Sequence, residues 1–372
     1  MKKSILDQLI ARAVLYATAA VMCFASIVHP AIEENGVIQI KAATPSHVIT
    51  HRLSKDAYQL FGHDVEKRTN GKVKFTWFFG DSLIKPSQSY EALRAGVVDL
   101  VVVAAYLYPD DFTITEGLSL PFTMQNSAHA ADVAWKMYKT IPEMRQEMKG
   151  FKFLGIFTSD VLNLHSTDGK LIKTLDEMKN IRVAVGSGSV AQMGKLFGME
   201  PQLVGYSEVY MALQRNIASA TLFPNAPLRS FRVTELTSAH TIANFKVDPM
   251  IIAMRQETWN ELPPEVQQVF DELTPSFARL CGHTLTNEGT WVLEELKKRG
   301  DLFYTPPAEE VAKWKQAIKP MYDAWINRLD AKGLNGKAIF AQMIEISEQI
   351  KVTDTPEDAW WAQGRIGKKN KK

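Results

Sequence analysis

A nearly uninterrupted apolar stretch, residues 97–104, constrains the fold more than any other part of the sequence. It reads VVDLVVVA, and Asp99 is its only polar residue. Side chains alternate between the two faces of a strand, so a strand of this composition has to be covered on both faces, as strands of parallel sheets are. Expected strands and helices alternate around it, with strands over residues 37–42 and 72–78 and helices over about 47–68 and 87–95. The sequence therefore predicts an α/β protein with a mostly parallel sheet covered by helices.

The alternation continues after Ser159 and predicts a second α/β unit. Helix-period patterns then follow over residues 265–273, 276–299, 309–332 and 336–350, of which the first begins at the pair Pro263-Pro264. We expect a two-lobed α/β fold with long C-terminal helices as a cover. Lobe I comprises residues 37–159 and 248–287, and lobe II with its helical cover comprises residues 160–247 and 288–355. A ligand would lie in the cleft between the lobes.

The N-terminus has the order of an export signal. Lys2, Lys3 and Arg12 precede a charge-free stretch, residues 13–28. We expect residues 1–32 to direct the chain to the periplasm as a signal peptide, with an uncleaved membrane anchor as the alternative. Removal of this segment would leave Cys281 as the only cysteine, so an intrachain disulfide is excluded for the mature chain.

Several function classes find no support in the residues. The formal net charge of +2 argues against nucleic-acid binding, and the basic end of the tail, within residues 356–372, is interpreted as a solvated terminus. His47 and His51 would share a helix face, but the Glu that a hydrolytic zinc motif places beside them is missing. We expect no catalytic residues, no metal and no cofactor.

Arg182 is the most informative polar residue of the second unit. It lies within the otherwise apolar strand expected over residues 181–185. A guanidinium keeps its proton, so burial of this side chain would require an anion beside it. A structural salt bridge or a solvated position at the end of the strand is the alternative interpretation.

Several blocks, taken together and in order, resemble the extracytoplasmic solute-binding proteins of tripartite ATP-independent periplasmic (TRAP) transporters, DctP type. The resemblance covers roughly residues 37–273, and it implies a two-lobed periplasmic binding protein fold of the type II-like class. The blocks are TNGKV at 69–73, EALRAGVVD at 91–99, LPF at 120–122, KTLDEMKNIRV at 173–183, SEVYMALQ at 207–214 and WNELP at 259–263.

The resemblance implies capture of a small organic acid and its delivery to the TRAP membrane permease subunits. It implies that Arg182 forms a bidentate salt bridge with the carboxylate of the solute. Counting without a gap places Phe223 where many members have a ligand-facing Asn, and Asn225 substitutes for it only if the turn is shifted. A phenyl ring at this place favours an apolar or aromatic solute, and packing of Phe223 at the hinge is the alternative.

Further contacts are expected from both lobes. Asn163 and His165 are candidate polar contacts near the place where some sugar-acid binders have a second arginine, which this chain lacks there. In lobe I the candidates are His47 at the first strand-helix turn, Trp77 at the end of the second strand and Tyr106 after the third, where parallel sheets present ligand contacts. We expect a monomer, with pairing through the C-terminal helices as the alternative.

Two other functions remain as alternatives at this point. The sequence GSGSVA at 186–191 follows a strand and fits the form G-x-G-x-x-A, with Glu200 or Glu208 as the distant acid, so an NAD(P)-dependent oxidoreductase is the enzymatic alternative. The same turn could instead donate backbone N–H groups to an anion. A sensory binding protein that feeds a receptor is the third class.

Overall fold

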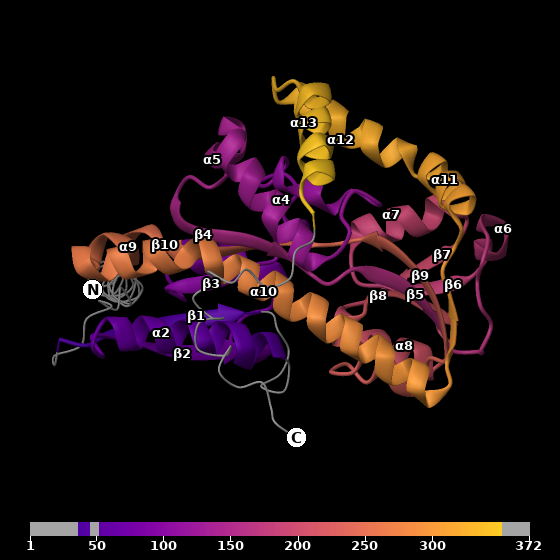
Figure 1. Cartoon of the computed structure of the whole chain (residues 1–372), viewed down its shortest axis with the longest axis horizontal. Coiled ribbons are helices and arrows are strands. Elements are labelled where there is room, and N and C mark those ends of the chain that lie inside the picture. Colours follow the sequence, from indigo (N-terminus) through magenta and orange to yellow (C-terminus); the bar gives the residue numbers. More distant parts are fainter. Residues whose placement is uncertain (1–35, 45–51, 352–372) are drawn as a thin grey trace, which may run out of the picture.

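The structure is a computed structural model, and it describes residues 36–44 and 52–351. The predictions for the signal segment, for His47 and for the tail lie outside these residues. The described chain forms two sheets with helices packed around them, as Figure 1 shows. Its α/β class and its two-lobed organisation confirm the fold predicted from the sequence.

The first sheet has five strands in the order β2-β1-β3-β10-β4. The first three are parallel, and β10 runs antiparallel to both of its neighbours. The strands are β1 (Ile38–Thr44), β2 (Val73–Phe79), β3 (Leu100–Val103), β4 (Phe151–Thr158) and β10 (Pro249–Arg255). The helices of this part are η1 (Ser54–Gln59), α2 (Leu60–Arg68), α3 (Ser89–Arg94), α4 (Ser127–Thr140), α5 (Pro142–Glu147) and α9 (Gln256–Glu261).

The second sheet has six strands in the order β11-β9-β5-β8-β6-β7. Here β5 is antiparallel to β8 and β9, while β6 is parallel to β7 and β8. The strands are β5 (Leu162–Ser166), β6 (Arg182–Val185), β7 (Glu200–Leu203), β8 (Ala220–Pro224), β9 (Ala239–Lys246) and β11 (Leu302–Tyr304). The helices are α6 (Leu175–Met178), α7 (Gly188–Leu196) and α8 (Val209–Gln214). Each sheet therefore contains a strand that runs against the mostly parallel order.

Strand β3 is buried on both faces, as its composition predicts. Val101 and Val103 belong to the hydrophobic cluster that contains α4, whereas Leu100 and Val102 belong to the cluster that contains α2. Four of the described α-helices, α4, α6, α7 and α13, begin where a side chain accepts from a backbone N–H of the first turn. At α4, for example, Asn126 accepts from the N–H of His129 at 2.9 Å.

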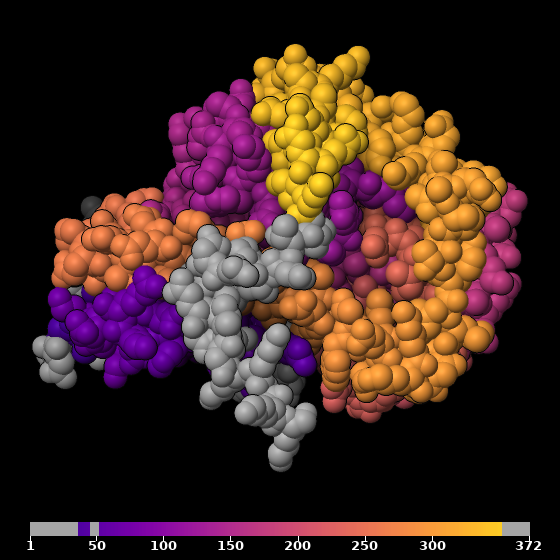
Figure 2. All heavy atoms as spheres, viewed as in Figure 1, coloured from indigo at the N-terminus to yellow at the C-terminus, as the bar shows by residue number. Residues whose placement is uncertain are grey.

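The C-terminal helices pack on both parts of the molecule. They are α10 (Pro264–Arg299), α11 (Ala308–Ala317), α12 (Lys319–Ala331) and α13 (Gly336–Gln349). Trp314 of α11 is buried in the cluster beside the second sheet, but Trp325 of α12 and Met343 of α13 are buried in the cluster of the first sheet. The sequence predicts residues 288–355 in lobe II, whereas α13 packs on lobe I and α12 contacts both clusters, with Met321 in that of the second sheet and Trp325 in that of the first. Figure 2 shows α13, in yellow, against the magenta surface of the first-lobe helices.

Helix α10 is continuous over 36 residues, although the sequence predicts two helices separated near Pro275. Proline lacks the N–H that would bond one turn back, so it usually ends or kinks a helix. Buried aromatic side chains on both sides of Pro275, Phe270 and Phe277, pack into one cluster and hold the helix together. Figure 1 shows α10 passing along both sheets.

Candidate functional site

A cavity of about 420 Å³ lies between the two sheets and is lined from both of them. Tyr106 and Leu107 follow β3 of the first sheet. Gly186 follows β6 and Pro224 ends β8 of the second. The carboxyl ends of parallel strands from both lobes therefore meet here, which is where open α/β sheets bind ligands. Its apolar wall includes Leu53, Leu107, Phe231, Met250 and Leu285.

Two segments of the chain cross between the lobes at the floor of this cavity. One contains Ser159 and Asp160 between β4 and β5, and the other contains Asp248 between β9 and β10. The N–H of Ser159 donates to the carbonyl of Asp248 at 2.8 Å, and the N–H of Asp248 donates to the Ser159 hydroxyl at 2.9 Å. The two crossings are thus tied to each other, and the cavity lies directly beside the hinge.

Asp248 is the centre of a cluster of polar side chains at the floor of the cavity. Its Oδ2 accepts from the phenol of Tyr206 at 3.0 Å, and its Oδ1 lies 2.8 Å from Nζ of Lys246. Lys246 Nζ also donates to the hydroxyl of Ser189 in the first turn of α7 at 2.8 Å. Lys246 and Asp248 are both fully buried, so each charge is compensated mainly by the other.

Asp160 is the second buried acid of the floor. Its Oδ2 accepts from the N–H of Ala226 at 3.0 Å. Burial raises the pKa of Asp160 to about 7 and outweighs the backbone hydrogen bonds, which lower it. Repulsion from the Glu288 carboxylate adds to the rise. Burial also raises the pKa of the Tyr206 phenol well above its ordinary value, with the charge of Asp248 as the next cause.

Arg182 is not brought to this cavity. It is the first residue of β6, its side chain is exposed, and the cavity is lined by Gly186 at the other end of the strand. Four residues of strand separate the two ends by roughly 10 Å. The alternative considered from the sequence, a solvated arginine at a strand end, describes what the structure has.

Phe223, Asn225 and Asn163 are buried beside the cavity and do not line it. Phe223 packs between the rings of Tyr206 and Phe231, with ring centroids 5.3 and 5.7 Å away. Asn163 Nδ2 donates to Asn225 Oδ1 at 3.0 Å, and Asn163 Oδ1 accepts from two backbone N–H groups at the end of β9. These amides join strands, and Phe223 packs in the hydrophobic cluster beside the second sheet.

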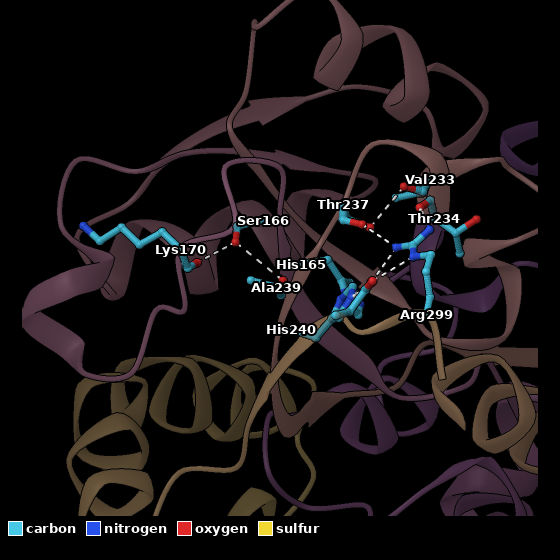
Figure 3. A network of polar contacts seen from close by, with 10 residues as sticks. His165, Ser166, Lys170, Val233, Thr234, Thr237, Ala239, His240 and Arg299 are labelled. Carbon is cyan, nitrogen blue, oxygen red and sulfur yellow. Dashed lines mark hydrogen bonds and ion pairs between the residues drawn. The ribbon is translucent and has the colours of Figure 1, made fainter. Parts of the chain in front are cut away.

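His165 belongs to a buried network instead of the cavity (Figure 3). Its Nδ1 lies 2.8 Å from Nδ1 of His240, and the Nε2 of His240 lies 2.8 Å from Oδ2 of Asp301. Arg299 donates to Asp301 and to backbone carbonyls of Thr234 and Thr237. The network fastens β5, β9 and the end of α10 to one another. Burial lowers the pKa of His165 well below its ordinary value.

Of the first-lobe candidates, Tyr106 lines the cavity, as its position after the third strand predicts. Trp77 is stacked against Phe75 and Phe79 on its own strand, with ring centroids 5.5 and 6.1 Å away. His47 lies outside the described residues. Among the eight candidates from the sequence, Tyr106 is therefore the one that the described part of the structure brings to the cavity.

The acids and the lysine of the floor are not among the candidates that the sequence singles out. A signal was present, because the sequence KVDP at 246–249 places a lysine and an aspartate two residues apart between two apolar strands. Opposite charges in such a place indicate a buried pair. The partners Tyr206 and Ser189 lie about 40 and 60 residues away along the chain, and local pattern does not reveal them.

The turn that resembles a dinucleotide fingerprint has a packing explanation. A Cβ at Gly186 would lie 2.6 to 2.8 Å from ring atoms of Tyr206, so glycine is required there by the close approach of that ring. Helix α7 then begins at Gly188, with the Ser187 side chain accepting from the N–H of Val190.

Within the part of the chain that the structure describes, none of the helices combines the length and the apolar composition that a membrane span needs.

Known proteins resemble this chain over most of its length. The chain is 24% identical to the C4-dicarboxylate-binding periplasmic protein DctP of Rhodobacter capsulatus over 308 residues, which cover 82% of this chain and 90% of that protein. A TRAP solute-binding protein from Rhodoferax ferrireducens, solved with copurified benzoate, superposes with a TM-score of 0.78 at 19% identity and covers 84% of this chain and 98% of that one.

A TRAP periplasmic solute-binding protein from Bordetella bronchiseptica, solved with bound (R)- and (S)-mandelate, superposes with a TM-score of 0.76 at 22% identity. The match covers 84% of this chain and all of that one. Residues 46–328 match the DctP family, described as bacterial extracellular solute-binding protein, family 7. This match, which covers most of the chain, shows that the chain belongs to the DctP family of bacterial extracellular solute-binding proteins.

Proposed function

We propose that the chain captures a small organic acid in the cavity between its lobes, outside the cytoplasm, and delivers it to a TRAP-type membrane permease. The cavity beside the hinge supports this proposal most directly, because a solute held there contacts both lobes and can favour their closed arrangement. A ligand shifts such an equilibrium only through its higher affinity for the closed state. Membership of the DctP family and the benzoate and mandelate of the superposed structures support the class of solute.

Ligand-dependent thermal unfolding tests the capture step. The purified chain would be melted with a panel of mono- and dicarboxylates, including aromatic, hydroxy and amino acids. A solute that binds only the folded state and is present at a free concentration of 100 times its Kd stabilises that state by about 2.7 kcal/mol. This raises the melting temperature measurably. A flat response across the whole panel would contradict the proposal.

Uptake tests the delivery step. Cells that contain a TRAP permease from the same source, together with this chain, should accumulate the solute identified by melting. Cells that contain the permease with a variant that folds but does not bind this solute should not. Equal uptake in both would show that transport does not depend on capture by this chain.

A further inference from the structure

The described lining of the cavity carries an excess of acidic groups. It includes the four carboxylates of Asp81, Asp160, Glu208 and Asp248, and its single basic group is Lys85. Neither arginine nor histidine occurs among these lining residues. An organic anion that entered this cavity would meet more negative than positive charge.

The charged residues of the lining differ in their burial. Asp160 and Asp248 are buried at the floor, whereas Asp81, Lys85 and Glu208 are exposed at the rim. The buried ammonium next to the floor, that of Lys246, is engaged by Asp248 and Ser189. The floor therefore offers oxygen acceptors, and the one cation of the described lining, Lys85, is at the entrance.

Asp248 also retains acceptor capacity. Nζ of Lys246 lies 2.8 Å from its Oδ1, but this contact lacks the alignment of a hydrogen bond, and Oδ1 is a buried oxygen without a hydrogen-bond partner. A carboxylate oxygen accepts from more than one donor. A donor on a bound solute would fill this position, and an ammonium group would also lie beside the second acid of the floor, Asp160, which Lys246 does not pair with.

The rest of the cavity accommodates an apolar body. Leu53, Phe231, Met250 and Leu285 line it, and the phenols of Tyr106 and Tyr206 border the acidic floor. Pockets of this kind enclose the apolar part of a ligand and orient it through a few polar groups.

We propose that the solute captured here is a zwitterion, an organic acid that also carries a positively charged nitrogen. Its ammonium group binds at Asp248 and Asp160, its apolar part packs against the wall formed by Leu53, Phe231, Met250 and Leu285, and its carboxylate faces the rim near Lys85. This inference rests on the proposed function and narrows its class of solute.

Matched pairs of compounds test this inference in isothermal titration calorimetry with the purified full chain. Each aliphatic or aromatic amino acid and each betaine is compared with the acid that has the same body but no nitrogen, as L-phenylalanine is with 3-phenylpropanoate. We expect the tightest ligand to be a zwitterion that binds at least 10-fold more tightly than its nitrogen-free partner.

Each outcome of this comparison bears on the inference. A nitrogen-free acid that binds as tightly as its zwitterion would overturn it and leave the proposed function in place. Binding by neither series would contradict the proposed function as well. Amines without a carboxylate give a third series. An amine that binds more tightly than every zwitterion would overturn the inference, because it would support the contact of the ammonium group with the acidic floor but refute the role of the carboxylate.

Two variants locate the ammonium contact. Asp160→Asn keeps the shape of the side chain and should lower the affinity for the zwitterion at least fivefold while changing that of the nitrogen-free acid less. Asp248→Asn should do the same, but it also leaves Lys246 without its partner, so Asp160→Asn is the decisive variant if the other does not fold. Asp323→Asn, which alters a carboxylate paired with Lys319 on the surface, is the matched control. Equal losses for both compounds in Asp160→Asn would contradict the inference.

Discussion

The phenol of Tyr206 donates a hydrogen bond to the carboxylate of Asp248 at 3.0 Å. Tyr206 belongs to the second lobe, and Asp248 lies in a segment that crosses to the first. The same carboxylate is paired with Lys246, and its backbone N–H is bonded to Ser159 of the other crossing segment. One aspartate therefore links the floor of the cavity to the two crossing segments that join the sheets, at residues 159–160 and 248.

Replacement of Asp248 by Asn should destabilise the chain strongly. It would leave the Lys246 ammonium buried without its counter-charge, and breaking a buried pair in this way costs about 3–5 kcal/mol. The free energy of unfolding from urea titrations measures the loss. The double variant Asp248→Asn with Lys246→Met should recover part of it, since no uncompensated charge remains. Additive losses in the double variant would show that the two side chains are not coupled.

Arg182→Ala should leave solute affinity unchanged within about twofold. The side chain is exposed at the start of β6 and does not line the cavity, and surface substitutions of this kind change stability by about 0.5 kcal/mol or less. Calorimetric titration with the best ligand from the panel measures the affinity. A loss of tenfold or more would show that Arg182 contacts the solute after all.

Gly289→Ala should destabilise the chain although alanine is the better helix former. A Cβ at this position of α10 would lie 1.9 Å from Oδ2 of Asp160, so the crossing segment or the helix has to move. Overpacking of this kind costs about 1–3 kcal/mol, more than the gain of about 1 kcal/mol in helix propensity. Gly188→Ala in α7, where nothing lies within 4 Å, is the control and should be neutral or stabilising. Equal melting temperatures for both variants would contradict the close contact.

The stability of the chain should depend on pH through Asp160. Burial raises the pKa of this carboxyl to about 7 in the folded chain, from about 4 when it is exposed. The folded state therefore favours the protonated form. This contribution to stability is complete below about pH 4 and is lost as the pH rises through about 7.

Urea titrations of the wild type and of Asp160→Asn across pH 4 to 8 measure this contribution. The difference in their unfolding free energies isolates Asp160 from the other titrating groups, and the wild type should lose its advantage with rising pH. A difference that does not change with pH would show that the carboxyl keeps its ordinary pKa.

The sequence predicts the fold well because the fold follows from local patterns. The apolar stretch at 97–104 contains β3, and turns and caps mark many of the helices. The predicted break of the helix near Pro275 is wrong. The missing N–H of Pro275 favours two helices, whereas the packing of Phe270 and Phe277 keeps one. The antiparallel strands β5 and β10 likewise depend on pairings between distant segments.

The site was less predictable for the same physical reason. Tyr106 was found because a residue after a parallel strand has a fixed place in such folds. The charge of Arg182 was visible, but its position depends on which end of the short strand β6 reaches the cavity. Asp160 and Asp248 acquire their roles only when the two crossing segments meet, and the pattern around either residue alone does not show this meeting.

Helix α10 limits how far the two lobes can move relative to each other. Phe277 and Cys281 anchor it in the cluster of the first sheet, and Val292 and Leu296 anchor it beside the second. A rod of about 54 Å fastened at both ends resists a wide swing of either lobe. In the proposed capture, closure around a solute would bend this rod near its midpoint, so its stiffness, together with the contacts in the cavity, would set how readily the solute is bound and released.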